Sequence, residues 1–96
     1  MNKYESVIII NPEVDEAGLK ALEEKFTGLI NENGKVEEDV DLGKRKLAYE
    51  IQKNKEAYYV QFNFESKPEA IAELERIYRI TDEILRQRTE REIQDA

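Results

Sequence analysis

The sequence predicts an α+β fold of the ferredoxin-like, split βαβ type, with four antiparallel strands and two helices on one face of the sheet. Two stretches carry apolar residues at helical spacing, and the segments around them alternate with a period of two. The resulting order is strand, helix, strand, strand, helix and a final strand. A chain of 96 residues suits one hydrophobic core, so we expect a single domain over residues 1–96.

The first predicted strand covers residues 4–11 and ends at a turn-forming Asn-Pro pair. Apolar side chains occupy both of its faces, Ile8 and Ile10 on one, Val7 and Ile9 on the other. Because one-sided strands alternate between apolar and polar residues, two apolar faces indicate a central strand that is covered at least partly on both sides.

Each predicted helix has an apolar stripe and recognisable ends. Asp15 can cap the first helix and the glycine at position 34 can end it; the stripe consists of Leu19, Leu22, Phe26, Leu29 and Ile30. For the second helix, Ser66 and Glu69 have the spacing of a capping box, and Thr81 marks the end. Its stripe consists of Ile71, Leu74, Ile77 and Tyr78.

The middle of the chain predicts a hairpin of two strands. Residues 35–41 read as an exposed strand, Gly43 marks a bulge or a loop, and alternation resumes over residues 47–51. Residues 53–55 form the expected hairpin tip, and residues 57–65 give the clearest strand of the sequence. We expect Leu47 and Tyr49 to pack against the protein, since they lie on the alternating apolar side.

The last segment leaves three structures open. After Glu83, Ile84 and Leu85 are apolar, whereas residues 86–91 are polar or charged. Residues 87–96 are therefore compatible with a polar edge strand, a helix or a disordered tail.

Composition excludes several functions. The chain has neither histidine nor cysteine, which removes the commonest general base, the commonest metal ligand and every thiolate site. We therefore predict no enzyme, no cofactor, no metal site and no small-molecule substrate. The longest apolar run, residues 7–10, is too short to span a membrane, and no leader is apparent, so we expect a cytoplasmic protein without a membrane partner.

The net charge of −7 hides an uneven distribution. Residues 1–41 carry −7 and residues 56–96 carry −4, whereas residues 42–55 carry +4. Charges further apart than about 8–10 Å are largely screened at physiological salt, so a basic segment can bind phosphate on an acidic protein. The alternative is that its lysines only protect an exposed strand edge from association with other sheets.

The predicted sheet leaves one face uncovered, and four residues on the two central strands would form its middle. We expect this face to bind a protein partner through Tyr59, Gln61, Val7 and Ile9.

Residues 42–51, which read LGKRKLAYEI, resemble the family of bacterial small-subunit ribosomal protein S6. Residues 3–12, 58–60 and 79–86 fit the same family, so the resemblance extends over residues 1–86. It implies a ferredoxin-like domain that binds the central domain of small-subunit ribosomal RNA together with ribosomal protein S18. Such a protein supports assembly of the small subunit, and hence translation, and is found on the cytoplasmic ribosome.

By position in that family, Lys44, Arg45 and Lys46 are expected to face phosphates. Further RNA contacts are expected from Lys3, Lys53, Lys55 and Arg86, with the protein partner as the alternative contact of Arg86. Two other functions stay open at this point: a non-ribosomal module that binds proteins through the open sheet face, and a regulatory domain that binds a small molecule.

Overall fold

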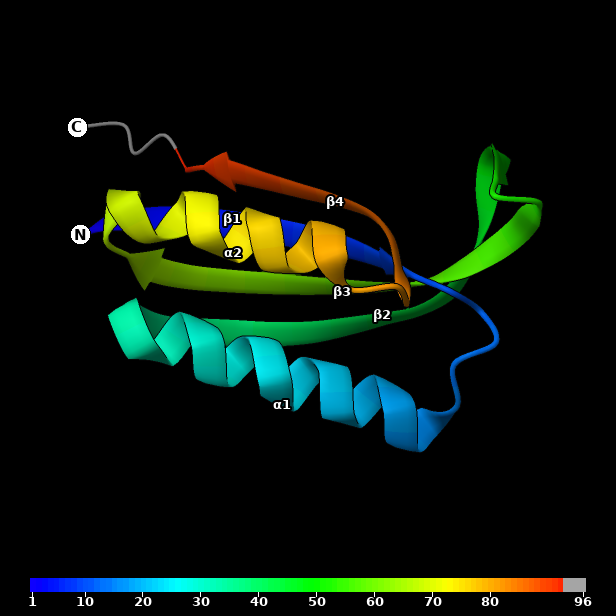
Figure 1. The fold of residues 1–96 in the computed structure, drawn as a ribbon, viewed down its shortest axis with the longest axis horizontal. Coiled ribbons are helices and arrows are strands. Elements are labelled where there is room, and N and C mark those ends of the chain that lie inside the picture. Colours follow the sequence, from blue (N-terminus) through cyan, green and yellow to red (C-terminus); the bar gives the residue numbers. More distant parts are fainter. Residues whose placement is uncertain (93–96) are drawn as a thin grey trace.

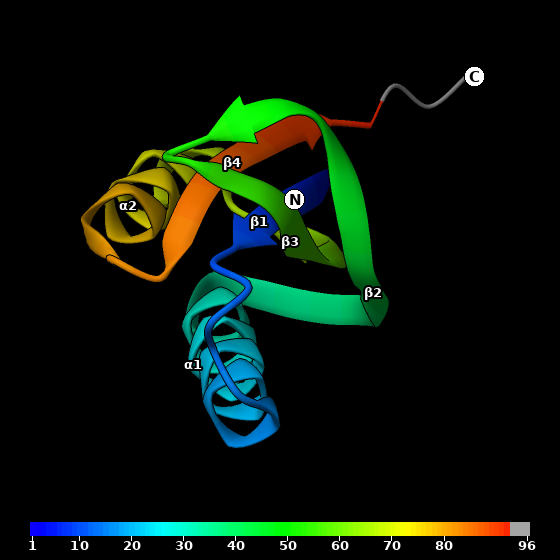
Figure 2. The ribbon, with the colours of Figure 1, turned by 90° about the vertical axis from the view of Figure 1, so that its right-hand side faces the viewer.

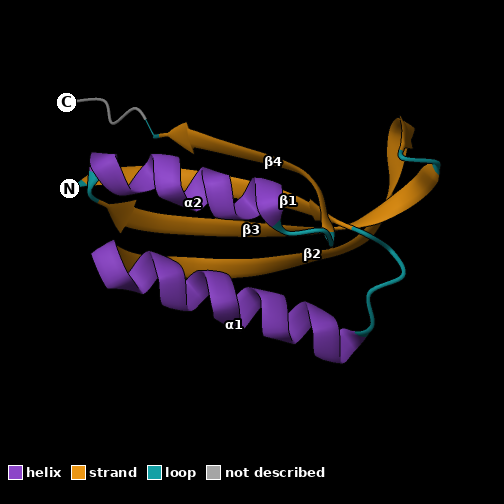
Figure 3. Ribbon diagram, viewed as in Figure 1, coloured by secondary structure: helices purple, strands orange, loops and turns teal. Residues whose placement is uncertain are grey.

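The structure, a computed structural model, describes residues 1–92 and contains six elements. These are β1 (Asn2–Ile10), α1 (Glu16–Asn33), β2 (Gly34–Ile51), β3 (Asn54–Ser66), α2 (Pro68–Ile80) and β4 (Ile84–Arg91). The strands form one antiparallel sheet in the order β2-β3-β1-β4 (Figures 1 and 3). Both helices lie on one face of this sheet (Figure 2). The predicted fold is confirmed, and β1 is the central strand that its two apolar faces indicated.

The core fills the space between the sheet and the helices. Its largest fully buried side chains include Ile8 on β1, Phe62 on β3, Phe26 on α1 and Tyr78 on α2. The rings of Phe26 and Tyr78 have centroids 4.6 Å apart and join the two helices over the sheet. The apolar stripes of the sequence thus meet in one cluster, because period-two and helical patterns face the same layer.

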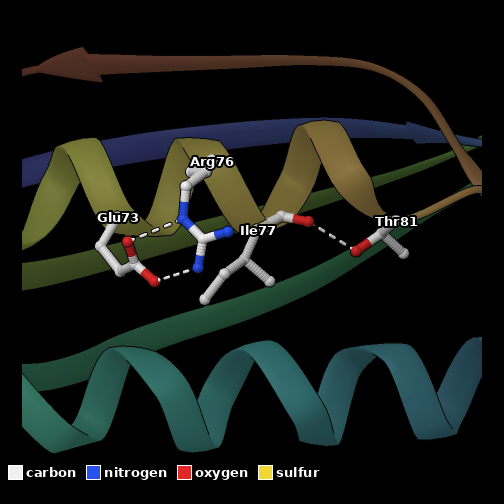
Figure 4. Close-up of polar contacts among 4 residues, drawn as sticks. All are labelled: Glu73, Arg76, Ile77 and Thr81. Carbon is white, nitrogen blue, oxygen red and sulfur yellow. Dashed lines mark hydrogen bonds and ion pairs between the residues drawn. The ribbon is translucent and has the colours of Figure 1, made fainter.

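Two helix ends are closed by side chains. Asp15 Oδ1 accepts a hydrogen bond of 2.7 Å from the backbone N–H of Gly18, as predicted for the cap of α1. At the end of α2, the Thr81 hydroxyl donates to the carbonyl oxygen of Ile77 over 2.6 Å and closes the last turn (Figure 4).

The start of α2 differs from the predicted capping box. The cap is Lys67, which makes no side-chain capping bond, and Pro68 occupies the first helical position. Ser66 therefore lies one residue too early to cap the helix, and its hydroxyl donates to the Lys67 carbonyl oxygen instead. Proline sets the start here because it needs no N–H partner in the first turn.

The polar last segment is a strand. β4 pairs with β1 from Ile84 to Arg91, and the N–H of Glu92 donates to the carbonyl oxygen of Lys3 over 2.9 Å. The edge strand of a sheet is stabilised by its backbone pairing and does not need apolar side chains on both faces. Three structures were open for residues 87–96, and residues 87–91 form the strand. Residues 93–96 lie outside the described residues.

Stability at alkaline pH is expected to depend on Tyr78. Its burial raises the pKa of the phenol to about 12; the Ser6 hydroxyl opposes this effect and Glu75 adds to it. The stabilisation is complete below the ordinary pKa of about 10 and is lost as the pH rises towards 12, because the unfolded state then ionises first. The free energy of unfolding falls by about 1.4 kcal/mol at pH 11 and by about 2.7 kcal/mol once the phenol is ionised in both states.

Urea unfolding of the wild type and Tyr78→Phe at pH 8 and pH 11 measures this effect. The variant should lose about 1.4 kcal/mol less than the wild type between the two pH values. Equal losses in the two proteins would contradict the assigned burial of the phenol.

Candidate nucleic-acid interface

The hairpin of β2 and β3 extends beyond the rest of the sheet (Figure 1), and its far part, residues 42–55, carries a net charge of +4. The five cations of residues 42–55 are Lys44, Arg45, Lys46, Lys53 and Lys55, and all five are exposed. None of them forms an ion pair within residues 1–92, where the ion pairs involve other cations. We call these five residues the basic hairpin cluster. Unpaired and hydrated, they are free to meet a polyanion.

A bulge at Gly43 begins this arm of the hairpin. Gly43 has a φ of +79°, and the pairing with β3 shifts register between Asp41 and Gly43. The Asp41 carboxylate accepts a hydrogen bond of 2.8 Å from the Gly43 N–H, which fixes the bulge. Bulges increase strand twist, so the arm turns away from the plane of the sheet. Of the bulge or loop predicted from the sequence, the bulge is observed, within one continuous strand.

The tip of the hairpin is a two-residue turn. Gln52 and Lys53 have φ values of +49° and +67°, and Ile51 pairs with Asn54 across them. Positive φ at both central residues is the geometry that matches the twist of a hairpin. The predicted tip at residues 53–55 was therefore one residue late.

Tyr49 does not pack as predicted. Between the pairs Lys46–Glu56 and Ile51–Asn54, residues 47–50 of β2 stand opposite a single residue of β3. This long bulge breaks the regular alternation, and Tyr49 is 67% exposed. Leu47 is half-buried.

The basic residues of β2 lie on both sides of the arm. Side chains alternate along a strand, so Lys44 and Lys46 project to one side and Arg45 to the other. Lys44 packs its ammonium group 5.2 Å from the ring centroid of Tyr58, and Arg45 Nε donates to the Leu42 carbonyl oxygen over 3.1 Å. The positive charge is therefore presented from both faces of the arm.

Lys3 lies apart from the basic hairpin cluster. It pairs with Glu65 on β3, whereas Lys44 pairs with Tyr58, about 23 Å further along that strand at roughly 3.3 Å per residue. Lys3 Nζ also lies 3.8 Å from Glu37 Oε2. The sequence did not show this separation, because the position of Lys3 depends on the register between β1 and β3.

Arg86 lies nearer to the start of the arm. Cross-strand pairing aligns Gly43, Tyr59, Ile9 and Arg86 in one row across the sheet. Side chains in such a row share one face, so Arg86 lies on the open face at the level where the basic arm begins. Unlike Lys3, it is positioned to extend the surface of the basic hairpin cluster.

The four residues predicted for partner binding are adjacent on the open face. Val7 pairs with Gln61 and Ile9 pairs with Tyr59, and all four are partly exposed. The predicted strand alternation is correct: the helices lie on the opposite face, with Ile8 and Phe62 beneath them. The structure thus gathers a small, mostly apolar patch that no part of residues 1–92 covers.

The first half of β2 is acidic. Burial raises the pKa of Glu23 on α1, and the neighbouring Asp39 and Asp41 raise it further. Burial also raises the pKa of Asp39, with a second contribution from Asp41. Crowded carboxylates make this side of the molecule unfavourable for a polyanion, in contrast to the basic arm of the same strand.

Neither a metal site nor a membrane span is found within the described residues. Residues 1–92 contain no group of three or more acidic side chains arranged to hold a metal ion. Neither α1 nor α2 combines the length and the apolar character that crossing a membrane requires.

Comparison with known proteins identifies the family. A family model described as ribosomal protein S6 matches residues 3–91. Small ribosomal subunit protein bS6 of Clostridium botulinum is 52% identical over 87 residues, which cover 90% of this chain and 93% of that protein. The bS6 protein of an Exiguobacterium species is 50% identical over 90 residues, covering 93% of this chain and 95% of its own.

A solved structure gives the same result. The crystal structure of 30S ribosomal protein S6 from Thermotoga maritima matches with a TM-score of 0.90 and 39% identity, covering 95% of this chain and 87% of that chain. The resemblance seen at residues 42–51 is confirmed. Membership of this ribosomal family replaces the two alternatives, a non-ribosomal module and a small-molecule regulatory domain. A protein of this family is a structural component of the cytoplasmic ribosome and not an enzyme. The chain belongs to the ribosomal protein S6 family of the small ribosomal subunit.

Proposed function

We propose that this protein binds the central domain of small-subunit ribosomal RNA through the basic hairpin cluster, together with ribosomal protein S18 on the open sheet face. One observation carries the RNA contact: five exposed cations without ion pairs gather in one hairpin of a protein with a net charge of −7. A hairpin that served only to protect a strand edge would not need five.

Contacts of this kind are made mainly with phosphates and sugars. Lysine and arginine on a projecting arm follow the shape of a folded RNA junction and do not need to read base edges. Binding should therefore weaken steeply with salt, because each phosphate that is neutralised releases counterions.

Two features of this chain favour a protein partner. The patch of Tyr59, Gln61, Val7 and Ile9 is a mostly apolar surface that the described part of the chain leaves uncovered. The net charge of −7 also gives weak long-range attraction to RNA, so a basic partner on this patch would assist the encounter. Ribosomal protein S18 is the partner that the family resemblance implies.

Binding of the purified protein to a central-domain RNA fragment tests the proposal, with S18 present or absent, over a range of salt concentrations. We expect the logarithm of the affinity to fall linearly with the logarithm of the salt concentration, and S18 to increase the affinity. A protein that keeps its partner after nuclease treatment but has no affinity for the RNA would contradict the RNA contact.

The partner contact makes a separate prediction. Tyr59→Ala removes the largest side chain of the patch and should weaken binding of S18 about tenfold or more, as expected for an aromatic residue central to an interface. Tyr49→Ala is the matched control, because Tyr49 lies on the arm and away from the patch. Equal affinities of S18 for both variants, measured without RNA by calorimetry, would contradict the assignment of the open face.

A further inference from the structure

A cleft of about 480 Å³ lies between the hairpin tip, the end of α2 and the start of β4. Figure 2 shows the hairpin curling over the end of the sheet towards these two elements. Its polar lining includes Gln52 from the tip, Arg79 from α2, and Arg86 and Gln87 from β4. Segments far apart in the sequence thus bring two arginines into the lining of one hollow.

We propose that this cleft binds a backbone phosphate of the ribosomal RNA, and that the side chains of Arg79 and Arg86 hold this phosphate. The proposal rests on the RNA-binding function proposed above and adds a site to it. It assigns a contact to Arg79, which neither the charge distribution nor the motif at residues 42–51 indicated.

The chemistry of the lining fits a phosphate. A guanidinium group presents a planar set of N–H donors that matches two phosphate oxygens at once, and it stays charged at every physiological pH. Gln52 and Gln87, which also line the cleft, carry side-chain amides that are neutral donors. A polar, open cleft of this kind suits a hydrated anion and not an apolar ligand.

Neither arginine is engaged by a carboxylate. Arg76, one turn before Arg79 on α2, donates from Nε to Glu73 over 2.9 Å (Figure 4), and Arg88 on β4 pairs with Glu90. Within residues 1–92, Arg79 and Arg86 form no ion pair; Arg79 Nε has only a long contact of 3.4 Å to the Glu75 carbonyl oxygen. Among the described residues, the two arginines that line the cleft are therefore without a carboxylate partner, whereas Arg76 and Arg88 on the same elements each have one.

The cleft continues the basic surface. Arg86 belongs to the cross-strand row that ends at Gly43, where the basic arm begins, and Gln52 precedes Lys53 at the tip. One RNA strand can therefore contact the basic hairpin cluster and place its next phosphates in the cleft. Glu50 also lines the cleft and opposes an anion there, so Glu50→Gln should strengthen RNA binding.

Arg79→Gln tests the site, with Arg76→Gln as its matched control on the same helix. Affinity for the central-domain RNA fragment is measured with S18 present at several salt concentrations. Loss of one phosphate contact should reduce the magnitude of the salt slope by about 0.7–0.9 and the affinity at 0.1 M salt by about five- to eightfold. Arg76→Gln should leave both unchanged, because that side chain is bound to Glu73 and is not part of the cleft lining.

The outcomes separate this proposal from the one on which it rests. If the wild type binds RNA but Arg79→Gln and Arg76→Gln share its salt slope, the cleft is not a phosphate site and the basic hairpin cluster remains the contact. If the wild type does not bind the RNA, the proposed function fails as well. Thermal unfolding of both variants, whose side chains are exposed, verifies that they are folded.

Discussion

A protein in which Lys44, Arg45 and Lys46 are all replaced by glutamate is expected to bind the central-domain RNA at least a hundredfold more weakly than the wild type at 0.1 M salt. Three lost phosphate contacts, at about 0.7–0.9 in salt slope each, correspond to a factor of about 130–500, and the added carboxylates increase the loss. The salt slope itself should become smaller by about 2–3. Filter binding over a salt series, with S18 present, measures both quantities.

A second triple variant controls for the change in net charge. Lys20→Glu, Lys25→Glu and Lys35→Glu alter the charge by the same amount, on exposed residues outside the basic hairpin cluster. This variant should keep the wild-type salt slope, and its affinity should fall far less, because only long-range attraction changes. Equal losses in the two triple variants would show that net charge, and not the hairpin, determines RNA binding.

Gly34→Ala is expected to destabilise the protein by about 3 kcal/mol, the upper end of the range for overpacked sites. A Cβ atom at Gly34 would stand 1.9 Å from the carbonyl oxygen of Glu65, which belongs to the paired backbone of β3. A backbone atom in a sheet cannot move aside as a side chain can, so the start of β2 must separate from β3. Urea unfolding monitored by circular dichroism measures the loss.

Gly28→Ala is the matched control for this experiment. Gly28 lies inside α1 and a Cβ atom there would meet nothing within 4 Å. Alanine should therefore stabilise the helix by about 0.5–1 kcal/mol, the usual cost of a helical glycine. Opposite signs for the two glycines are the expected result; a stable Gly34→Ala protein would contradict the close approach of β2 and β3.

Most of the fold follows from patterns that depend on single elements. The alternation around Phe62 determines which face of its strand is buried, and the helical spacing of Leu22 and Phe26 does the same for α1. All of these apolar side chains lie in one core layer. The sequence-based predictions fail where the structure of one segment is decided by other segments of the same chain. Ser66 cannot cap α2 because Pro68 sets its start, and the polar β4 is held by its pairing with β1.

The candidate site was only partly predictable for a related reason. The basic hairpin cluster is contiguous in the sequence, so its charge could be read directly from residues 42–55. The separation of Lys3 and the row that includes Arg86 depend on strand register, and the cleft with Arg79 depends on how the hairpin curls. Tyr49 was assigned to packing because alternation gives no sign of a long bulge.

The basic hairpin, and not the acidic helix α1, is expected to face the ribosomal RNA. The absence of cysteine from the sequence allows a direct measurement, because a single introduced thiol can carry a tethered hydroxyl-radical source. Ala48→Cys places it on the arm, and Ala21→Cys places it on α1; both alanines are exposed. In assembled small subunits, strong cleavage of central-domain RNA is expected from position 48 and little from position 21. Equal cleavage from both positions, or stronger cleavage from α1, would contradict this orientation of the protein on the RNA.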